Sequence, residues 1–224
     1  MMTAPSYNQD SQHNPYPGPR PFGVEERSYF FGRDEETNIL TAMVMAQRAV
    51  LFFAQSGAGK SSLLHAGLVP ALKRQQRSGD RRGPRMRVFS IATVGKGLPS
   101  TLTKPVSNIY TFSTLLSLFS NRDADALAGL SLTKALAPYF PSTPSQPKDT
   151  TASPNYERAD FDDTAPLTTL LILDQFEEIF TQHPERHSER EAFLHQVNEA
   201  LRSYERGAPT CRSIHATRAN GSIS

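Results

Sequence analysis

The chain has 224 residues, of which 38% are hydrophobic and 17 are proline, and its formal net charge is +2 at neutral pH. This length suits one α/β domain with tails, and the small net charge points to no strongly charged partner. The single cysteine, Cys211, excludes an internal disulfide framework and a cysteine metal cluster. The sequence has neither the layout of a secretory signal nor an apolar run near the ~20 residues that cross a bilayer, so we expect a cytoplasmic protein with no membrane contact.

The first part of the chain changes from a proline-rich arm to a folded domain. Residues 1–21 are polar and dense in proline, which predicts a flexible, extended arm. Asp34 is a good N-cap, and apolar residues then recur at helical spacing, which predicts a helix over about 34–47. The continuous apolar run 49–54 is typical of a strand that is covered on both faces.

The next motif carries the clearest chemistry. Residues 51–64 read as an apolar strand, a loop of small residues, and Lys60-Ser61 opening a helix. Backbone N–H groups and a helix N-terminus then point at one place and favour an anion, so the pattern predicts a phosphate-binding loop of the Walker A type. Lys60 is expected to reach the β- and γ-phosphates, and the Ser61 hydroxyl to ligate Mg²⁺. The residues expected to bind the nucleotide here are Ala54, Gln55, Ser56, Gly57, Ala58, Gly59, Lys60, Ser61 and Ser62.

Ala54 stands where such loops commonly have glycine. If this position needed a positive φ, alanine would cost about 1–2 kcal/mol of strain. The rest of the pattern is intact and lies between a buried strand and an amphipathic helix, which favours nucleotide binding over a degenerate loop. Pro70 is expected to kink or end the helix that follows.

A basic stretch, residues 73–87, leaves two interpretations open. Cations are favourable at a helix C-terminus and in a solvated loop, and this is the simpler interpretation. The alternative is a nucleic-acid patch, which no interleaved aromatic residue supports.

The middle of the chain predicts a second strand at 88–94 and helices at about 109–119 and 124–137. Residues 138–166 are rich in Pro, Ser, Thr and Asp, which predicts a disordered surface insertion. A third buried strand is expected at 167–173. A capping box of Ser188 and Glu191 predicts the start of the last helix.

The third strand ends in Asp174, the expected Walker B carboxylate. A carboxylate at the C-terminal end of a buried parallel strand faces the ligand crevice, so Asp174 is expected to hold Mg²⁺, usually through water, opposite Ser61. Glu177 or Glu178 could polarise the attacking water. The other interpretation is that these two residues form an acidic helix start favoured by the helix dipole.

Four blocks, in matching order, resemble the novel STAND NTPases, which are signal-transduction ATPases. They are Pro-Tyr-Pro-Gly-Pro-Arg-Pro-Phe at 15–22, Tyr-Phe-Phe-Gly-Arg-Asp-Glu-Glu at 29–36, Gly-x-Gly-Lys-Ser-Ser-Leu-Leu at 57–64 and Leu-Asp-Gln-Phe-Glu-Glu-Ile-Phe at 173–180. The resemblance implies that Gly32 and Arg33 lie near the nucleotide base. It also implies a slow ATPase that acts as a conformational switch, with protein partners or self-association.

The C-terminus departs from this family. Residues 211–219 fall where a central strand with a polar sensor is expected, with Arg218 roughly at the sensor position, but they are not continuously apolar. No residues remain for the further strand and helical lid, as in a truncated product or a fragment.

The sequence therefore predicts a three-layer α/β P-loop NTPase domain over 22–207, with a mainly parallel sheet, C-terminally incomplete and followed by a weakly structured tail at 208–224. The expected function is a signalling switch that binds ATP and Mg²⁺, with hydrolysis slow or lost. The alternatives are a nucleotide-binding interaction module without hydrolysis and a nucleic-acid binder that uses residues 73–87.

Overall fold

A computed structural model describes residues 18, 20–77, 85–95, 97–139, 167–202 and 211–218. Most of the predicted arm (1–21) and nearly all of the predicted insertion (138–166) lie outside the described residues. The elements in chain order are η1 (Arg27–Tyr29), α1 (Asp34–Ala46), β1 (Ala49–Ala54), α2 (Lys60–Ser62), η2 (Leu63–Leu68), α3 (Val69–Arg77), β2 (Arg85–Val88), β3 (Ala92–Thr93), α4 (Ile109–Leu118), α5 (Ala124–Leu127), α6 (Leu132–Leu136), η3 (Ala137–Tyr139), β4 (Leu167–Asp174), α7 (Glu178–Thr181), α8 (His187–Arg202) and β5 (Cys211–Arg218).

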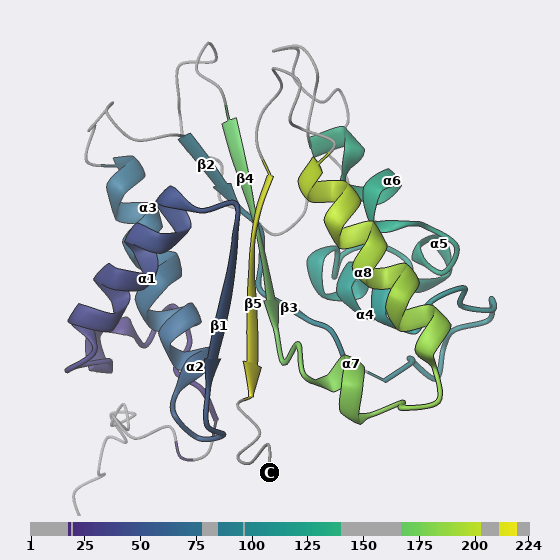
Figure 1. The fold of residues 1–224 in the computed structure, drawn as a ribbon, viewed down its shortest axis with the longest axis horizontal. Helices are drawn as coiled ribbons and strands as arrows, with labels where there is room; N and C mark the ends of the chain where they lie inside the picture. Colours follow the sequence, from purple (N-terminus) through teal and green to yellow (C-terminus); the bar gives the residue numbers. More distant parts are fainter. Residues whose placement is uncertain are drawn as a thin grey trace, which may run out of the picture.

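The strands form one parallel sheet in the order β1-β5-β4-β2, and the short β3 also pairs with β4. Ile214 at the centre of β5 lies in register with Val50 on one side and Ile172 on the other. All strands run in the same direction, so their C-terminal ends meet at one edge (Figure 1). This edge is where ligands bind in parallel α/β sheets.

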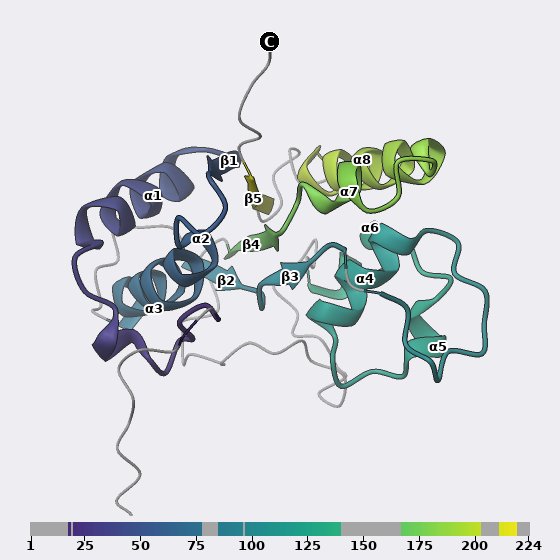
Figure 2. The ribbon, with the colours of Figure 1, turned by 90° about the horizontal axis from the view of Figure 1, so that it is seen from below.

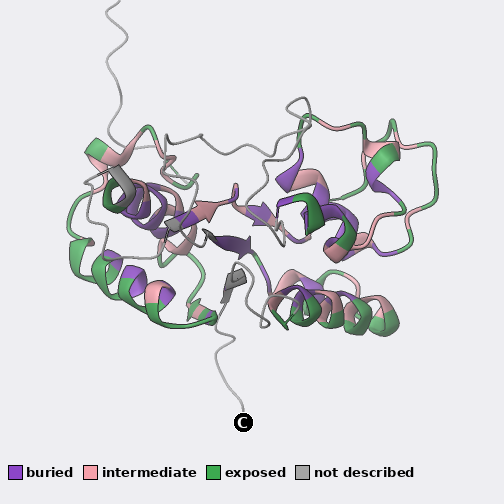
Figure 3. Cartoon of the chain, turned by 90° about the horizontal axis from the view of Figure 1, so that it is seen from above, coloured by how far each residue is buried: buried purple, intermediate pink, exposed green. Residues whose placement is uncertain are grey.

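Helices cover both faces of the sheet, which makes the three layers that the sequence predicts (Figure 2). One face carries α1, η2 and α3 over a core that includes Leu40, Leu64 and Leu72. The other carries α4 to α8 over a second core that includes Phe112, Leu136 and Phe193. Burial is concentrated along the sheet and on the helix surfaces that face it (Figure 3). The α/β fold class predicted from the sequence is confirmed.

The segment around Pro70 differs from the expected kinked or shortened helix. The six residues before α3 form the π-helix η2, in which Val69 N–H donates to the carbonyl of Leu64, five residues back. Pro70 then lies in the first turn of α3, where a missing N–H costs little. The chain therefore continues as helix from Lys60 to Arg77.

Residues 211–218 correct the sequence prediction most clearly. Their polar composition predicted a weakly structured tail from 208, but they form the central strand β5, which pairs with both β1 and β4. Ile214 is fully buried in the core and gives the strand an apolar centre. Strand formation here depends on two flanking partners that lie far away in sequence rather than on local composition.

The end of the helical layer also differs in detail. The strand predicted at 88–94 is wrong in its bounds, because β2 ends at Val88 and only Ala92–Thr93 of the predicted range form a strand, β3. The predicted helix 124–137 divides into α5, α6 and the start of η3. The capping-box prediction is wrong in register, because α8 begins at His187 and Arg190 N–H already donates to the Arg186 carbonyl. Glu189 instead accepts from the backbone N–H of Ile109 at 2.9 Å and joins the start of α4 to α8. Within the described part of the chain, no helix is both long and apolar enough to cross a lipid bilayer.

Candidate nucleotide site

The predicted phosphate loop leaves β1 at the C-terminal edge of the sheet and returns into α2. Gly57 and Gly59 have φ values of +80° and +78°, the left-handed region that favours glycine. Among the described residues other than glycine, only Gln175 has a positive φ. Ala54 therefore has a negative φ, and alanine at this position causes no backbone strain. The loop is closed by a hydrogen bond of 3.2 Å from Ala58 N–H to the Gln55 carbonyl.

Lys60 lies across this loop. Its ammonium Nζ donates to the carbonyl of Ala54 at 2.9 Å and to that of Gln55 at 3.1 Å. Both acceptors are neutral, so the ammonium charge is held at the loop without being cancelled. The N-terminus of the helix run that starts at Lys60 adds its own positive dipole end at the same place. The arrangement favours an anion such as a phosphate.

Ser61 and Ser62 follow Lys60 in the first turn of α2, and both are half-buried. The Ser62 hydroxyl accepts a hydrogen bond of 3.1 Å from the backbone N–H of Phe22, a residue 40 positions earlier. The segment just after the predicted arm therefore packs on the phosphate-loop helix. Among the described residues, none forms a hydrogen bond with the Ser61 hydroxyl.

Arg33, at the start of α1, also contacts the phosphate loop. Its Nη1 donates to the carbonyl of Ala58 at 3.1 Å, and its Nε lies 2.7 Å from the Glu36 carboxylate. A Cβ added at Gly59 would lie 3.4 Å from the same Nη1, so the loop and the guanidinium are in close contact. Gly32, with φ +74°, makes the turn that places Arg33 there. The structure thus brings the Gly32-Arg33 pair against the loop itself.

Asp174 ends β4 and is buried, with 7% of its surface exposed. Its Oδ1 accepts from the backbone N–H of Gln175 at 2.9 Å, which fixes the carboxylate orientation. Only β5 separates β4 from β1, so Asp174 lies level with Phe52, two strand spacings away or about 10 Å at the usual ~4.8 Å spacing.

Two further carboxylates follow Asp174 in the same turn region. The Oε2 atom of Glu177 is buried and has no hydrogen-bond partner among the described residues. Burial, then the nearby Glu177 and Asp174 carboxylates, raise the pKa of Glu178. Glu178 also packs tightly against Gly95, in the loop that follows β3. A Cβ added at Gly95 would lie 1.7 Å from Oε2 of Glu178 and 2.7 Å from Cβ of Glu178.

The raised pKa of Glu178 predicts a pH-dependent stability effect. A carboxyl whose pKa is raised in the folded state costs stability once the pH exceeds its unfolded value, because the unfolded chain ionises it more readily. Glu178→Gln is therefore expected to raise the melting temperature at pH 7.5 and to leave it nearly unchanged near pH 4. Thermal unfolding of both proteins at the two pH values tests this. A fall in melting temperature at pH 7.5 would contradict it.

Sequence reasoning missed two histidines near this edge. His65 lies four residues after Ser61 on the same run of helix; burial lowers its pKa and the Asp174 charge raises it. The sequence could have indicated His65, because residues four positions apart, such as Ser61 and His65, lie on the same face of a helix. His215 on β5 contacts the Phe176 ring, with centroids 4.5 Å apart, and burial lowers its pKa to about 4, so it is neutral at pH 7.

The residues present fit a divalent cation that is bound together with a phosphate. The described residues contain no group of three His, Cys, Asp or Glu side chains that could hold a metal alone. Mg²⁺ commonly uses one or two protein oxygens and completes its shell with water and phosphate. The Ser61 hydroxyl, Asp174 and the surplus of negative charge around Glu177 and Glu178 match that pattern.

The structure also bears on the basic stretch 73–87. Arg87 points inward, since its Nη1 donates to the Tyr139 carbonyl at 2.6 Å. Residues 78–84, which include Arg81 and Arg82, lie outside the described residues.

Arg218 is the last residue of β5 and lies in register with Ala54, so the backbone of the expected sensor position lies beside the start of the phosphate loop.

Comparison with known families gives one match: the family model described as Novel STAND NTPase 1 covers residues 15–221. Comparison with curated proteins and with solved structures gives no match. The matched span includes the phosphate loop, Asp174 and all five strands.

Proposed function

The chain belongs to the Novel STAND NTPase 1 family and is a nucleotide-binding NTPase module; from this premise we propose that it binds ATP with Mg²⁺ and acts as a nucleotide-dependent signalling switch. The observation that carries the proposal is the Lys60 ammonium held on the Ala54 and Gln55 carbonyls at the end of β1. A phosphate in the loop would gain a cation, the loop N–H groups and the helix dipole together.

In this proposal Lys60 binds the β- and γ-phosphates, and residues 54–62 surround the phosphate chain. Ser61 and Asp174 hold Mg²⁺, which supplies neutralisation of the phosphate oxygens when it is bound. Gly32 and Arg33 close the site from the start of α1, where Arg33 already donates to Ala58. Nucleotide binding would therefore act directly on α1, through Arg33, and on the segment at Phe22, through Ser62. Both are elements that a switch could move.

We propose that hydrolysis is slow or absent. The Glu178 carboxylate is packed against Gly95, and Glu177 has a buried oxygen, so either would have to move before it could orient a water molecule. The second candidate function is a binding module without turnover. Phosphate release no faster than that of Lys60→Ala, with ATP binding retained, would favour this candidate. A nucleic-acid role for residues 73–87 has less support, because Arg87 is committed to Tyr139.

Asp174→Asn tests the Mg²⁺ part of the proposal. The substitution keeps the shape of the side chain and removes its charge, so Mg²⁺ should no longer strengthen ATP binding. We expect the affinity for Mg-ATP to fall about tenfold or more, as for other groups that hold a metal through water, with metal-free ATP little affected. Calorimetric titration with and without Mg²⁺ measures both. Asp123→Asn, on an exposed loop residue, is the matched control, and an equal Mg²⁺ effect in all three proteins would contradict the assignment.

A further inference from the structure

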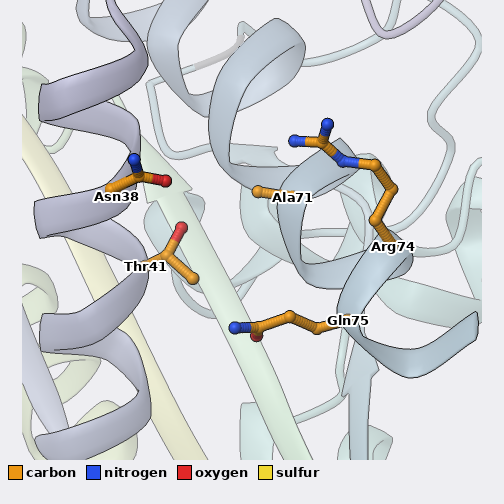
Figure 4. A pocket seen from close by; sticks show the side chains of 5 residues that line it. All are labelled: Asn38, Thr41, Ala71, Arg74 and Gln75. Atoms are coloured by element: carbon orange, nitrogen blue, oxygen red, sulfur yellow. The ribbon is translucent and has the colours of Figure 1, made fainter. Parts of the chain in front are cut away.

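A pocket of about 260 Å³ lies between α1 and α3, in the helical layer on the β1 side of the sheet. Asn38 and Thr41 line it from α1, and Ala71, Arg74 and Gln75 line it from α3 (Figure 4). Ala71 follows Lys60 by 11 residues along one helical run, which is about 16 Å at ~1.5 Å per residue. The pocket is thus separate from the phosphate loop.

The lining of this pocket is rich in donors. Figure 4 shows the Asn38 amide, the Arg74 guanidinium and the Gln75 amide directed toward the space between the two helices. None of the five lining residues is acidic. Within the described residues, no carboxylate pairs with Arg74, which is exposed to solvent. The Thr41 hydroxyl donates to the Thr37 carbonyl at 2.7 Å, so it is oriented and can only accept.

A second cation, outside the lining of the pocket, interacts electrostatically with Arg74. Arg27, in η1, has a buried Nη1 atom without an acceptor among the described residues. Burial and then the charge of Arg74 lower the pKa of Arg27, while Asp34 raises it. Two guanidinium groups that repel each other, one with a buried donor unsatisfied, are an unfavourable arrangement in the absence of an anion.

We propose that the pocket between α1 and α3 binds a phosphate monoester, held by Arg74 and the amides of Asn38 and Gln75 that line it, with the charge of Arg27, which lies outside the lining, acting from farther away. Guanidinium groups bind phosphate through two parallel hydrogen bonds, and a monoester dianion matches two cations better than a singly charged diester. The pocket is smaller than the ~300–1,000 Å³ typical of sites for drug-sized ligands. This size suits a terminal phosphate group together with the first few atoms of the molecule to which it is bonded. A free phosphomonoester and a phosphorylated side chain of a partner both present this group.

Binding at this pocket would join α1 to the helical run of η2 and α3, which α1 already contacts through η2. A Cβ added at Gly67, in η2, would lie 2.6 Å from the Thr37 hydroxyl oxygen of α1. The helix α1 also follows directly on Arg33, which contacts the phosphate loop. An anion between α1 and α3 would therefore hold the helix that brings Arg33 to the nucleotide site.

The test uses the full chain with Lys60→Ala, which removes the phosphate affinity expected at the loop. Isothermal titration with inorganic phosphate, and separately with a short phosphoserine peptide, should give saturable binding. Adding Arg74→Ala or Arg27→Ala should weaken it about tenfold, the worth of one charged hydrogen bond. Arg74→Lys should restore only part of the loss, because the charge returns without the planar fork.

Arg202→Ala, which removes an exposed arginine from the last turn of α8, is the control and should leave phosphate binding unchanged. Tighter binding of the peptide identifies a phosphorylated side chain as the ligand, and equal binding identifies free phosphate; both support the proposal. Unchanged phosphate binding in Arg74→Ala and Arg27→Ala would overturn it. So would stronger binding of single-stranded DNA than of phosphate at equal phosphate concentration, since that would show a preference for diesters.

Discussion

Lys60→Ala is expected to weaken ATP binding about 100-fold, because charge-assisted hydrogen bonds to phosphate contribute roughly 1.5–3 kcal/mol each and this ammonium is placed to make more than one. The Nζ atom already lies within hydrogen-bonding distance of the Ala54 and Gln55 carbonyls, so the wild-type side chain needs little reorganisation to meet a ligand. Titration with a fluorescent ATP analogue measures the loss.

Lys134→Ala is a suitable control for this experiment, since Lys134 is an exposed lysine in α6 on the other face of the sheet. It changes the net charge by the same amount and should leave the affinity for ATP unchanged. An affinity for ATP in Lys60→Ala equal to that of wild type would contradict the assignment of the loop as the nucleotide site. Equal rates of phosphate release by wild type and Lys60→Ala would contradict a hydrolytic function.

Gly95→Ala is expected to destabilise the fold by about 1–3 kcal/mol, the range for forcing extra atoms into a packed site. The new methyl group would lie 2.7 Å from Cβ of Glu178, an atom that side-chain rotation cannot move away. The start of α7 would have to shift, and the carboxylates beside Asp174 would move with it. Chemical denaturation measures the free energy of unfolding.

Gly97→Ala provides the matched comparison for Gly95→Ala. Gly97 is exposed, and a Cβ there would have no heavy atom within 4 Å. The same chemical change two residues away is therefore expected to be neutral or slightly stabilising. Equal effects of the two substitutions would show that Glu178 does not pack on Gly95 as described.

Local sequence patterns predicted the elements whose own residues specify their secondary structure. The apolar run 49–54 became β1 with the same bounds, although only Val50 in it is buried and the strand is not covered on both faces. Helix α1 begins at Asp34, but the N-cap residue is Arg33 rather than the predicted Asp34. The family assignment made from the four motif blocks is confirmed by the match over 15–221. These features depend on short segments whose composition is enough to specify them.

Long-range pairing limited the rest of the prediction. Strand β5 has a buried centre at Ile214 but polar neighbours, and it becomes a strand because β1 and β4 supply hydrogen bonds on both sides. The contacts of Arg33 with Ala58 and of Glu178 with Gly95 join residues 25 and 83 positions apart. No local motif encodes such contacts, so the motif residues of the site could be named from the sequence while their packing could not.

The most direct test of the account is a calorimetric titration of the full chain with ATP, in the presence and absence of Mg²⁺. We predict saturable binding of one ATP per chain that Mg²⁺ strengthens, with the Mg²⁺ effect lost in Asp174→Asn and the affinity for ATP reduced about 100-fold in Lys60→Ala. The absence of ATP binding by the wild-type chain, or binding that is indifferent to both substitutions, would contradict the claim that the loop at the end of β1 is a nucleotide site.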